Sequence, residues 1–242
     1  MSSARDQQDH IYLTQEADSF FLRWRGAQGS LGVEAPLRDG KAQLHDLLSS
    51  NVDVSGKNVL EVGCFIGDHL AHLKSDLGCV VSGIEPSQMA CDFALSQFGL
   101  ELECATFFTS RLLRESRFRH HFDVVIVDDV LSWVSRALIL DAVTRIDSVL
   151  RPGGHLLLRD FSPPFGFAVE NHHVPGQSVY NFKQPGGHAQ FFLLTGMYVP
   201  RATFTRASDE FQVRTSSRPD SAIWSDSLLE KLHTPLHPIV DL

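Results

Sequence analysis

The chain has 242 residues, of which 43% are hydrophobic and 21% are charged, and its formal net charge is -8 at pH 7. This length and composition are typical of one globular domain with some elaboration, and they exclude a low-complexity or fibrous protein. Because the negative net charge opposes long-range attraction to phosphate backbones, we expect no nucleic-acid partner.

Hydropathy and cysteine usage indicate the cellular setting. No apolar stretch approaches the length of a membrane helix, and residues 1–6 contain no apolar core of a signal peptide. We therefore expect a cytoplasmic protein with no membrane partner, present as a monomer or homodimer. The cysteines form no C-x-x-C pair and are expected to be buried free thiols, at Cys64, Cys79, Cys91 and Cys104.

The first 50 residues, 1–50, are predicted to form a helical cap. Bulky rings in this segment precede the first core strand, and leucines at helical spacing over 37–48 predict a helix beside the sheet. The aromatic part has two interpretations, which the sequence leaves open. It is either a helix that covers a sheet edge, or a cap over a ligand with Tyr12, Arg23 and Trp24 facing it.

The core begins with alternating strands and helices. Apolar runs predict strands at 58–63 and 79–84, with a weaker third strand at 100–104. Helical periodicity predicts helices at 67–76 and 87–98, and the second of these ends at a glycine. This alternation predicts parallel strands joined by right-handed crossovers.

A continuous apolar run at 122–127 is typical of a strand that is buried on both faces of a parallel sheet. Asp128 and Asp129 stand at its carboxyl end. The helical pattern over 138–150 stops at a Pro-Gly-Gly turn, and the fifth strand begins at His155.

The pattern changes after Asp160. Residues 161–187 combine prolines, rings and histidines with little periodicity, which favours a lid or pocket wall. Further on, a short helix is expected at 190–196, and an antiparallel strand pair at 198–206 and 210–216. We divide the chain into the cap, a ligand-binding domain over 51–220 and a tail without readable chemistry over 221–242.

The turn after the first strand restricts the ligand. Counting from Gly63, the second and third glycine positions of a dinucleotide site hold Phe65 and Asp68, so a diphosphate would meet a ring and a carboxylate. No Gly-Lys-Ser/Thr follows the turn, which excludes a P-loop. Glu85 ends the second strand, about 20 residues on, where a Rossmann-type unit holds ribose hydroxyls. An adenosine-bearing ligand without phosphates remains.

An ordered set of motifs over residues 55–162 resembles the class I S-adenosylmethionine-dependent methyltransferases. The set comprises Glu61-x-Gly63-x-x-x-Gly67, then Glu85, Asp128, and Leu150-Arg151-Pro152-Gly153-Gly154. The resemblance implies an α/β fold with a doubly wound, Rossmann-like, seven-stranded and mostly parallel sheet that includes an antiparallel C-terminal strand pair. It also implies S-adenosylmethionine as the cofactor.

The same resemblance implies roles for single residues. Glu61 and Gly63 would line the methionine portion, Gly67 would permit close helix packing, Glu85 would accept both ribose hydroxyls, and Asp128 would lie beside the methionine end. Many members have a further glycine where this chain has Phe65. The full set of expected cofactor-binding residues is Glu61, Gly63, Cys64, Phe65, Gly67, Glu85, Pro86, Asp128, Asp129 and Arg23.

Four later segments resemble, more weakly, a bacterial methyltransferase group of surface-sugar and secondary-metabolite biosynthesis. They are 160–165, His172-His173, 180–183 and 191–198. This resemblance implies a small polar acceptor, a sugar or natural-product intermediate, methylated at oxygen or nitrogen. RNA or protein methylation, or cofactor binding without catalysis, are the alternatives.

Methyl transfer from a sulfonium is an in-line displacement, and a base is needed only where the acceptor must lose a proton. We expect that base to be His172 or His173, because imidazole titrates near neutral pH. Asp160 would orient the imidazole or bind an acceptor amine; alternatively, it caps the following turn. Expected substrate contacts are Tyr12, Trp24, Trp133, Phe161, Tyr180 and Lys183.

The aspartates that follow the fourth and fifth strands could also hold a magnesium ion. Asp128, Asp129 and Asp160 offer oxygen ligands. However, Phe161 follows Asp160 where the catechol-type pattern has an amide side chain. We therefore expect no metal.

Overall fold

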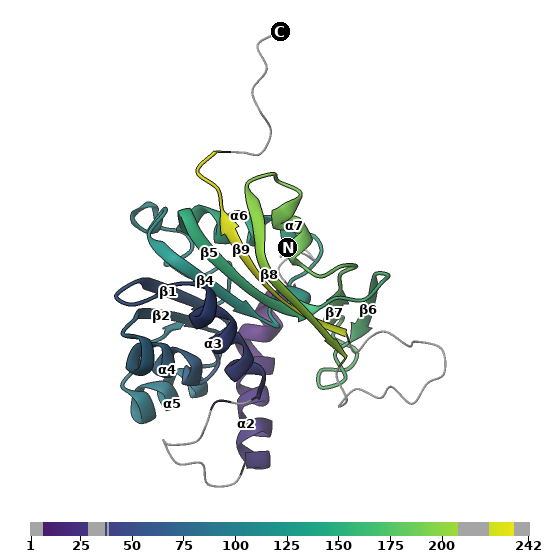
Figure 1. Ribbon diagram of the computed structural model, residues 1–242. Coiled ribbons are helices and arrows are strands. Elements are labelled where there is room, and N and C mark those ends of the chain that lie inside the picture. Colours follow the sequence, from purple (N-terminus) through teal and green to yellow (C-terminus); the bar gives the residue numbers. More distant parts are fainter. Residues whose placement is uncertain (1–6, 29–36, 38, 208–222, 235–242) are drawn as a thin grey trace.

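The computed structural model describes residues 7–28, 37, 39–207 and 223–234. Its main sheet has the strand order β3-β2-β1-β4-β5-β9-β8 (Figure 1). The strands are β1 (Asn58–Val62), β2 (Val80–Glu85), β3 (Glu103–Cys104), β4 (Phe122–Asp128), β5 (Leu150–Phe161), β8 (Tyr198–Ala207) and β9 (Ile223–Lys231).

The first five strands of this sheet run parallel, whereas β9 runs antiparallel to both β5 and β8. The chain crosses from β3 back to β4 beside β1, so the strand order reverses between β1 and β4. Ligands of open α/β sheets bind outside the carboxyl ends of the strands at such a point. The predicted doubly wound, seven-stranded fold with a C-terminal antiparallel pair is confirmed.

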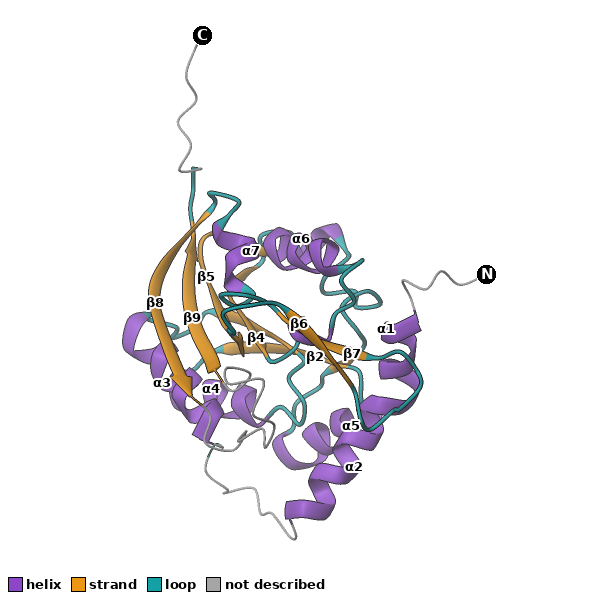
Figure 2. Ribbon diagram, turned by 90° about the vertical axis from the view of Figure 1, so that its right-hand side faces the viewer, coloured by secondary structure: helices purple, strands orange, loops and turns teal. Residues whose placement is uncertain are grey.

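Helices cover both faces of the sheet (Figure 2). The helices α3 (Asp39–Asn51), α4 (Asp68–Leu77) and α5 (Gln88–Phe98) pack on one face, and α6 (Ile139–Val149) and α7 (Ala189–Leu193) pack on the other. Each face has its own apolar cluster, because alternate residues of a strand point to opposite sides. The buried run of β4 contributes to both clusters, as expected for a central parallel strand.

Two further units lie beside the carboxyl ends of the parallel strands (Figure 2). One is the N-terminal segment, made of α1 (Gln7–Ile11), the π-helical turn η1 (Tyr12–Glu16) and α2 (Ala17–Gln28). The other is an antiparallel hairpin of β6 (Phe167–Glu170) and β7 (Tyr180–Lys183). Single turns of 3-10 helix occur at η2 (Ser116–Phe118) and η3 (Leu131–Trp133).

Several expectations about the fold need correction, including the start of the fifth strand, which is Leu150 and not His155. The partner of β8 is β9, from the segment predicted to be a tail, whereas 210–216 lies outside the described residues. The third strand has only two residues, 103–104, instead of 100–104. Cys104 is exposed, although all four cysteines were expected to be buried. Within the described ranges, no helix combines the length and apolar character needed to cross a bilayer.

Candidate functional site

The loop between β1 and α4 is fixed by its glycines and by β2. Gly63 has a φ of +72°, and a Cβ atom there would meet the side chain of Val130, so the position requires glycine. Gly67 has a φ of +74° directly before α4. The backbone N–H groups of Gly63 and Cys64 donate to the carbonyl oxygen of Ile84 at 2.8 and 3.1 Å. The loop is therefore held against the end of β2.

Phe65 links this loop to α2. Its backbone has a φ of +54°, and its N–H donates a hydrogen bond of 2.9 Å to Oε2 of Glu85. Its ring packs against Phe20, Phe21 and Trp24 of α2, with centroid distances of 5.1, 6.2 and 5.2 Å. The ring of Phe65 thus anchors the N-terminal segment.

Glu85 presents a buried carboxylate at the carboxyl end of β2. Oε2 accepts from the N–H of Phe65, and Oε1 accepts from the N–H of Ser87 at 2.9 Å. Burial raises the pKa of Glu85 to about 7, although the two backbone hydrogen bonds and Lys41 oppose this shift. A ligand that donates hydrogen bonds to this carboxylate would stabilise its charged form.

Cys64 and Pro86 offer only their backbone polar groups to a ligand at this loop. The Cys64 side chain is fully buried in the apolar cluster under α4, where it lies against Gly83. The carbonyl oxygen of Pro86 accepts from the thiol of Cys104 at 3.6 Å. Any contact of these residues with a cofactor stays a prediction.

A buried chain of charges lies beneath the strand ends. Lys41 of α3 pairs with Glu61 of β1, and its Nζ lies 3.1 Å from Oδ2 of Asp128 at the end of β4. Arg159 of β5 makes two hydrogen bonds with Asp226 of β9, at 2.7 and 3.1 Å, and its Nε lies 3.9 Å from Oδ1 of Asp128. These pairs tie four strands and α3 together.

Glu61 is therefore charged and internally paired. Burial raises its pKa, but Lys41 and His69 outweigh burial and lower it to about 2. Burial likewise lowers the pKa of Lys41, but Glu61 and Asp128 raise it well above its usual value. The contacts expected between the cofactor and Glu61 or Asp128 stay predictions, because both carboxylates already pair with Lys41.

Polar side chains gather where β4 and β5 end. Asp129 has a φ of +53°, and its Oδ1 accepts from the hydroxyl of Ser132 at 3.1 Å. Asp160 accepts from the backbone N–H of Phe161 at 2.7 Å and of Ser132 at 3.1 Å. Nδ1 of the buried His188 lies 3.0 Å from Oδ2 of Asp160. Asp160 is held by groups on three different segments.

Lys183 of β7 brings a cation to the same cluster. Its Nζ lies 3.0 Å from the ring centroid of Phe161, and the rings of Phe161 and Trp224 lie 3.9 Å apart, centroid to centroid. Burial lowers the pKa of Lys183 to about 8, although Asp129 and Asp160 oppose the shift. Burial and the neighbouring Asp160 raise the pKa of Asp129, which Lys183 opposes. Lys183 and Asp129 therefore lie close enough for each to oppose the effect of burial on the pKa of the other.

The N-terminal segment covers this cluster. The side chain of Gln8 donates to the carbonyl oxygens of Trp133 and Tyr180, and it accepts from the N–H of Tyr180 at 3.2 Å. The rings of Tyr12 and Trp133 meet edge to face at 5.8 Å. One helical turn thus contacts both η3 and the hairpin strand β7.

The second half of the segment reaches β2 and the hairpin turn. Arg23 pairs with Glu16 at 2.7 Å, and Asn171 donates to the same oxygen of Glu16 at 3.2 Å. Asp18 accepts from the hydroxyl of Ser87 at 2.6 Å, directly after Glu85. Trp24 packs on Phe65 and Phe93, and Arg23 pairs with Glu16. Whether the segment caps a ligand or only covers the sheet stays open.

His172 and His173 lie apart from the cluster. Both side chains are exposed in the turn between β6 and β7, with their rings 3.9 Å apart. Asn171 accepts from the N–H of His173 at 2.9 Å. The imidazole beside Asp160 belongs to His188, which corrects the expected pairing of Asp160 with His172 or His173.

Sequence reasoning missed several residues of the site. Lys41 lies three residues before Leu44 and seven before Leu48, a spacing that places all three on one side of a helix. The sequence therefore contained a signal that Lys41 is buried. Gln8, His188 and Asn181, whose Nδ2 donates to the Ser132 hydroxyl at 3.1 Å, carried no such signal. Their partners come from segments far away in the chain.

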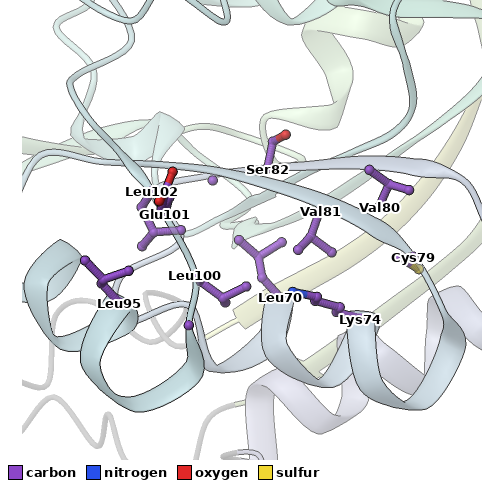
Figure 3. Close-up of a pocket in the computed structure, with 12 residues that line it drawn as sticks. Leu70, Lys74, Cys79, Val80, Val81, Ser82, Leu95, Leu100, Glu101 and Leu102 are labelled. Carbon is purple, nitrogen blue, oxygen red and sulfur yellow. The ribbon is translucent and has the colours of Figure 1, made fainter.

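A separate pocket of about 480 Å³ lies beside the first residues of β2, between α4 and α5 (Figure 3). Leu70, Val81 and Leu100 lie around its centre, and Lys74 lies at one side (Figure 3). It exists because the short β3 leaves the start of β2 without a neighbour on that side. Neither Glu85 nor the aspartates at the ends of β4 and β5 line it, so we do not assign it to the site.

The sequence profile of the methyltransferase domain family matches residues 37–197, more than half of the chain. The chain belongs to this methyltransferase family. Together with the strand order, this confirms the predicted class I methyltransferase. The matched range includes the glycine loop, Glu85 and the aspartates after β4 and β5.

One curated protein is similar to this methyltransferase in sequence. A tRNA N(3)-cytidine methyltransferase of Xenopus tropicalis is 29% identical over 110 residues, which is 43% of this chain and only 33% of that protein. The chain thus matches about a third of the length of this curated relative.

Two solved structures share the fold. The Burkholderia thailandensis 1,6-didemethyltoxoflavin-N1-methyltransferase superimposes with a TM-score of 0.68 at 13% identity, covering 96% of this chain and 92% of that one. The Haemonchus contortus phosphoethanolamine N-methyltransferase 2 gives 0.62 at 15% identity, covering 93% and 60%. At these identities the likeness establishes the fold alone.

Proposed function

We propose that this methyltransferase transfers a methyl group from S-adenosylmethionine to an oxygen or nitrogen atom of a small polar acceptor, a sugar or natural-product intermediate. The observation that carries the proposal is the polar cluster of Asp129, Asp160 and Lys183 at the ends of β4 and β5. The N-terminal segment and the β6–β7 hairpin lie across it, as they would over a small substrate.

The residues around the glycine loop fit the cofactor. Gly63 leaves no room for a Cβ atom, and Glu85 offers a desolvated carboxylate oriented by two N–H groups. Glu85 would accept hydrogen bonds from the ribose hydroxyls, and the Gly63 loop and Asp129 would lie along the methionine portion. When bound, the cofactor supplies an electrophilic methyl group on a sulfonium. The two structural neighbours carry S-adenosylhomocysteine and S-adenosylmethionine.

The polar cluster would orient the acceptor and take its proton. Asp160 keeps a fixed carboxylate because two N–H groups and His188 surround it. Lys183, whose pKa is lowered to about 8, is partly neutral near that pH, and we propose it as the base. His172 and His173 are the alternative base, and they would have to act from an exposed turn.

The acceptor experiment has two steps. Isothermal titration with S-adenosylhomocysteine first establishes that the purified chain binds the cofactor product. A panel of sugars, amines and phenols is then screened with S-adenosylmethionine for a mass gain of one methyl group. Loss of turnover in Lys183→Met, but not in Lys74→Met on the outside of α4, supports the proposed cluster. Turnover in both variants at the wild-type rate contradicts it.

An RNA acceptor is the second candidate, because the curated relative is named as a tRNA methyltransferase. The net charge of -8 opposes binding to a phosphate backbone. Filter binding with bulk tRNA across a salt series separates the two candidates. Salt-sensitive binding with methyl incorporation into tRNA would favour RNA, whereas absence of both favours the small acceptor.

A further inference from the structure

Two cysteines flank the turn that carries Glu85. Cys91 lies on α5 and Cys104 is the last residue of β3, directly opposite Glu85 in the strand register. The thiol of Cys91 donates to the carbonyl oxygen of Glu85, and the thiol of Cys104 donates to that of Pro86, both at 3.6 Å. Each thiol is also near enough to the other to affect its pKa. The carbonyl groups of two successive residues, Glu85 and Pro86, thus each accept a hydrogen bond from one of the two thiols.

Access to solvent differs within this pair. Cys104 is exposed, whereas Cys91 is buried behind it. The other two cysteines are buried in the apolar cluster under α4, and the Cys79 thiol donates to the carbonyl oxygen of Val54 at 3.4 Å. A reagent from solvent therefore reaches Cys104 first and finds Cys91 as the adjacent thiol.

We propose that Cys91 and Cys104 form an oxidation site, in which a disulfide weakens binding of the cofactor at Glu85. The oxidant is a small-molecule disulfide of the glutathione type. The thiolate of Cys104 attacks one of its sulfur atoms, breaks the S–S bond and releases one thiolate. The thiolate of Cys91 then attacks the Cys104 sulfur and releases the second. Two electrons pass to the small disulfide, and its two thiolates take the protons that the protein thiols lose.

The surroundings make the exchange slow at neutral pH. Burial raises the pKa of both thiols above its usual range. The charged groups that face the pair are Glu85 of β2, Asp92 of α5 and Asp18 of α2, all of them acidic, so they raise it further. Since the thiolate is the nucleophile, the rate rises with pH.

The effect on the cofactor follows from geometry, and it depends on the proposed role of Glu85. Sulfur atoms in a disulfide lie closer than in two separate thiols, and they carry no proton. Oxidation therefore removes the donors to the Glu85 and Pro86 carbonyls and draws β3 toward α5. The carboxylate of Glu85 is oriented by the same turn, through the N–H of Ser87.

The experiment treats the full chain with oxidised glutathione at about pH 7 and about pH 9, then maps disulfides by peptide mass spectrometry. We expect a Cys91–Cys104 linkage that forms faster at the higher pH. Oxidised protein should bind S-adenosylhomocysteine about tenfold more weakly, as is common for coupled sites, and dithiothreitol should restore binding. Cys104→Ser should keep its affinity under oxidant, whereas the control Cys79→Ser should respond like the wild type.

Two results overturn the proposal. One is a stable glutathione adduct on Cys104 without the internal linkage. The other is the linkage with unchanged affinity for S-adenosylhomocysteine. Equal affinity of reduced wild type and Glu85→Gln would instead overturn the ribose role of Glu85, and the peptide map would still decide the disulfide separately.

Discussion

The backbone N–H of Phe65 donates a hydrogen bond of 2.9 Å to the carboxylate of Glu85, joining the glycine loop after β1 to the end of β2. The same residue packs its ring against α2. One side chain therefore holds the N-terminal segment while its backbone orients the acid expected to bind ribose. Variants of Glu85 therefore test the carboxylate, whereas variants of Phe65 test the packing of the N-terminal segment.

Glu85→Gln should weaken binding of S-adenosylhomocysteine about 10- to 100-fold, because hydrogen bonds to a charged acceptor are lost. Burial raises the folded-state pKa of Glu85 from 4.5 to about 7, so the wild type should lose stability as pH rises through this range. The free energy of unfolding of Glu85→Gln should lose this pH dependence, and the variant should be destabilised overall because its amide nitrogen cannot accept from one of the two backbone N–H groups. Titration calorimetry and urea unfolding measure both, and Glu101→Gln, an exposed acid, is the control.

Phe65→Ala and Phe65→Gly should both destabilise the fold, by about 2–4 kcal/mol, because the ring packs between α2 and the glycine loop. The difference in stability between the two variants is the sharper test. With a φ of +54°, alanine keeps the strained left-handed backbone that glycine relieves, so the glycine variant should be more stable by about 1 kcal/mol. Urea unfolding of the two proteins decides this. The reverse order would show that position 65 does not hold a left-handed backbone in solution.

Patterns local in the chain were readable from the sequence. The central strand β4 is a continuous apolar run, and α5 ends at Gly99 as predicted. By contrast, β9 buries the polar residues Ser225, Asp226 and Ser227, so no apolar run marked it as a strand. Asp226 is stable there because Arg159, far away in the sequence, pairs with it.

The same reason limits prediction of the site. Glu85 and the aspartates after β4 were placed correctly at strand ends because strand position is a local property. His188 and Gln8 act through partners on other segments, at Asp160 and Tyr180, and neither has a periodic neighbour that reveals its side. Tertiary pairing of polar groups is what the sequence alone did not show.

Lys41→Met should destabilise the fold by about 3–5 kcal/mol, because it leaves the buried carboxylates of Glu61 and Asp128 without their shared partner. The wild type should also lose stability in acid. Since Lys41 lowers the folded pKa of Glu61 from 4.5 to about 2, the stabilisation is complete above about pH 4.5 and decreases as pH falls toward 2. Urea unfolding over this range should show a weaker pH dependence in Glu61→Gln. Lys74→Met is the matched control, and an equal loss in that variant would contradict the role of the pair.

Lys183→Met should lower the turnover of the acceptor found in the screen by about 100-fold or more, the usual contribution of a general base. Binding of S-adenosylhomocysteine should stay within about twofold of the wild type, because we propose that Lys183 contacts the acceptor and not the cofactor. The wild-type rate should rise with pH through about 8, where the Lys183 ammonium loses its proton, and Lys183→Met should lose this rise. His172→Ala and His173→Ala should keep the rise, because both rings are exposed and the imidazole beside Asp160 is that of His188. If either histidine variant loses turnover while Lys183→Met keeps it, the base that takes the acceptor's proton is a histidine of the β6–β7 turn and not Lys183.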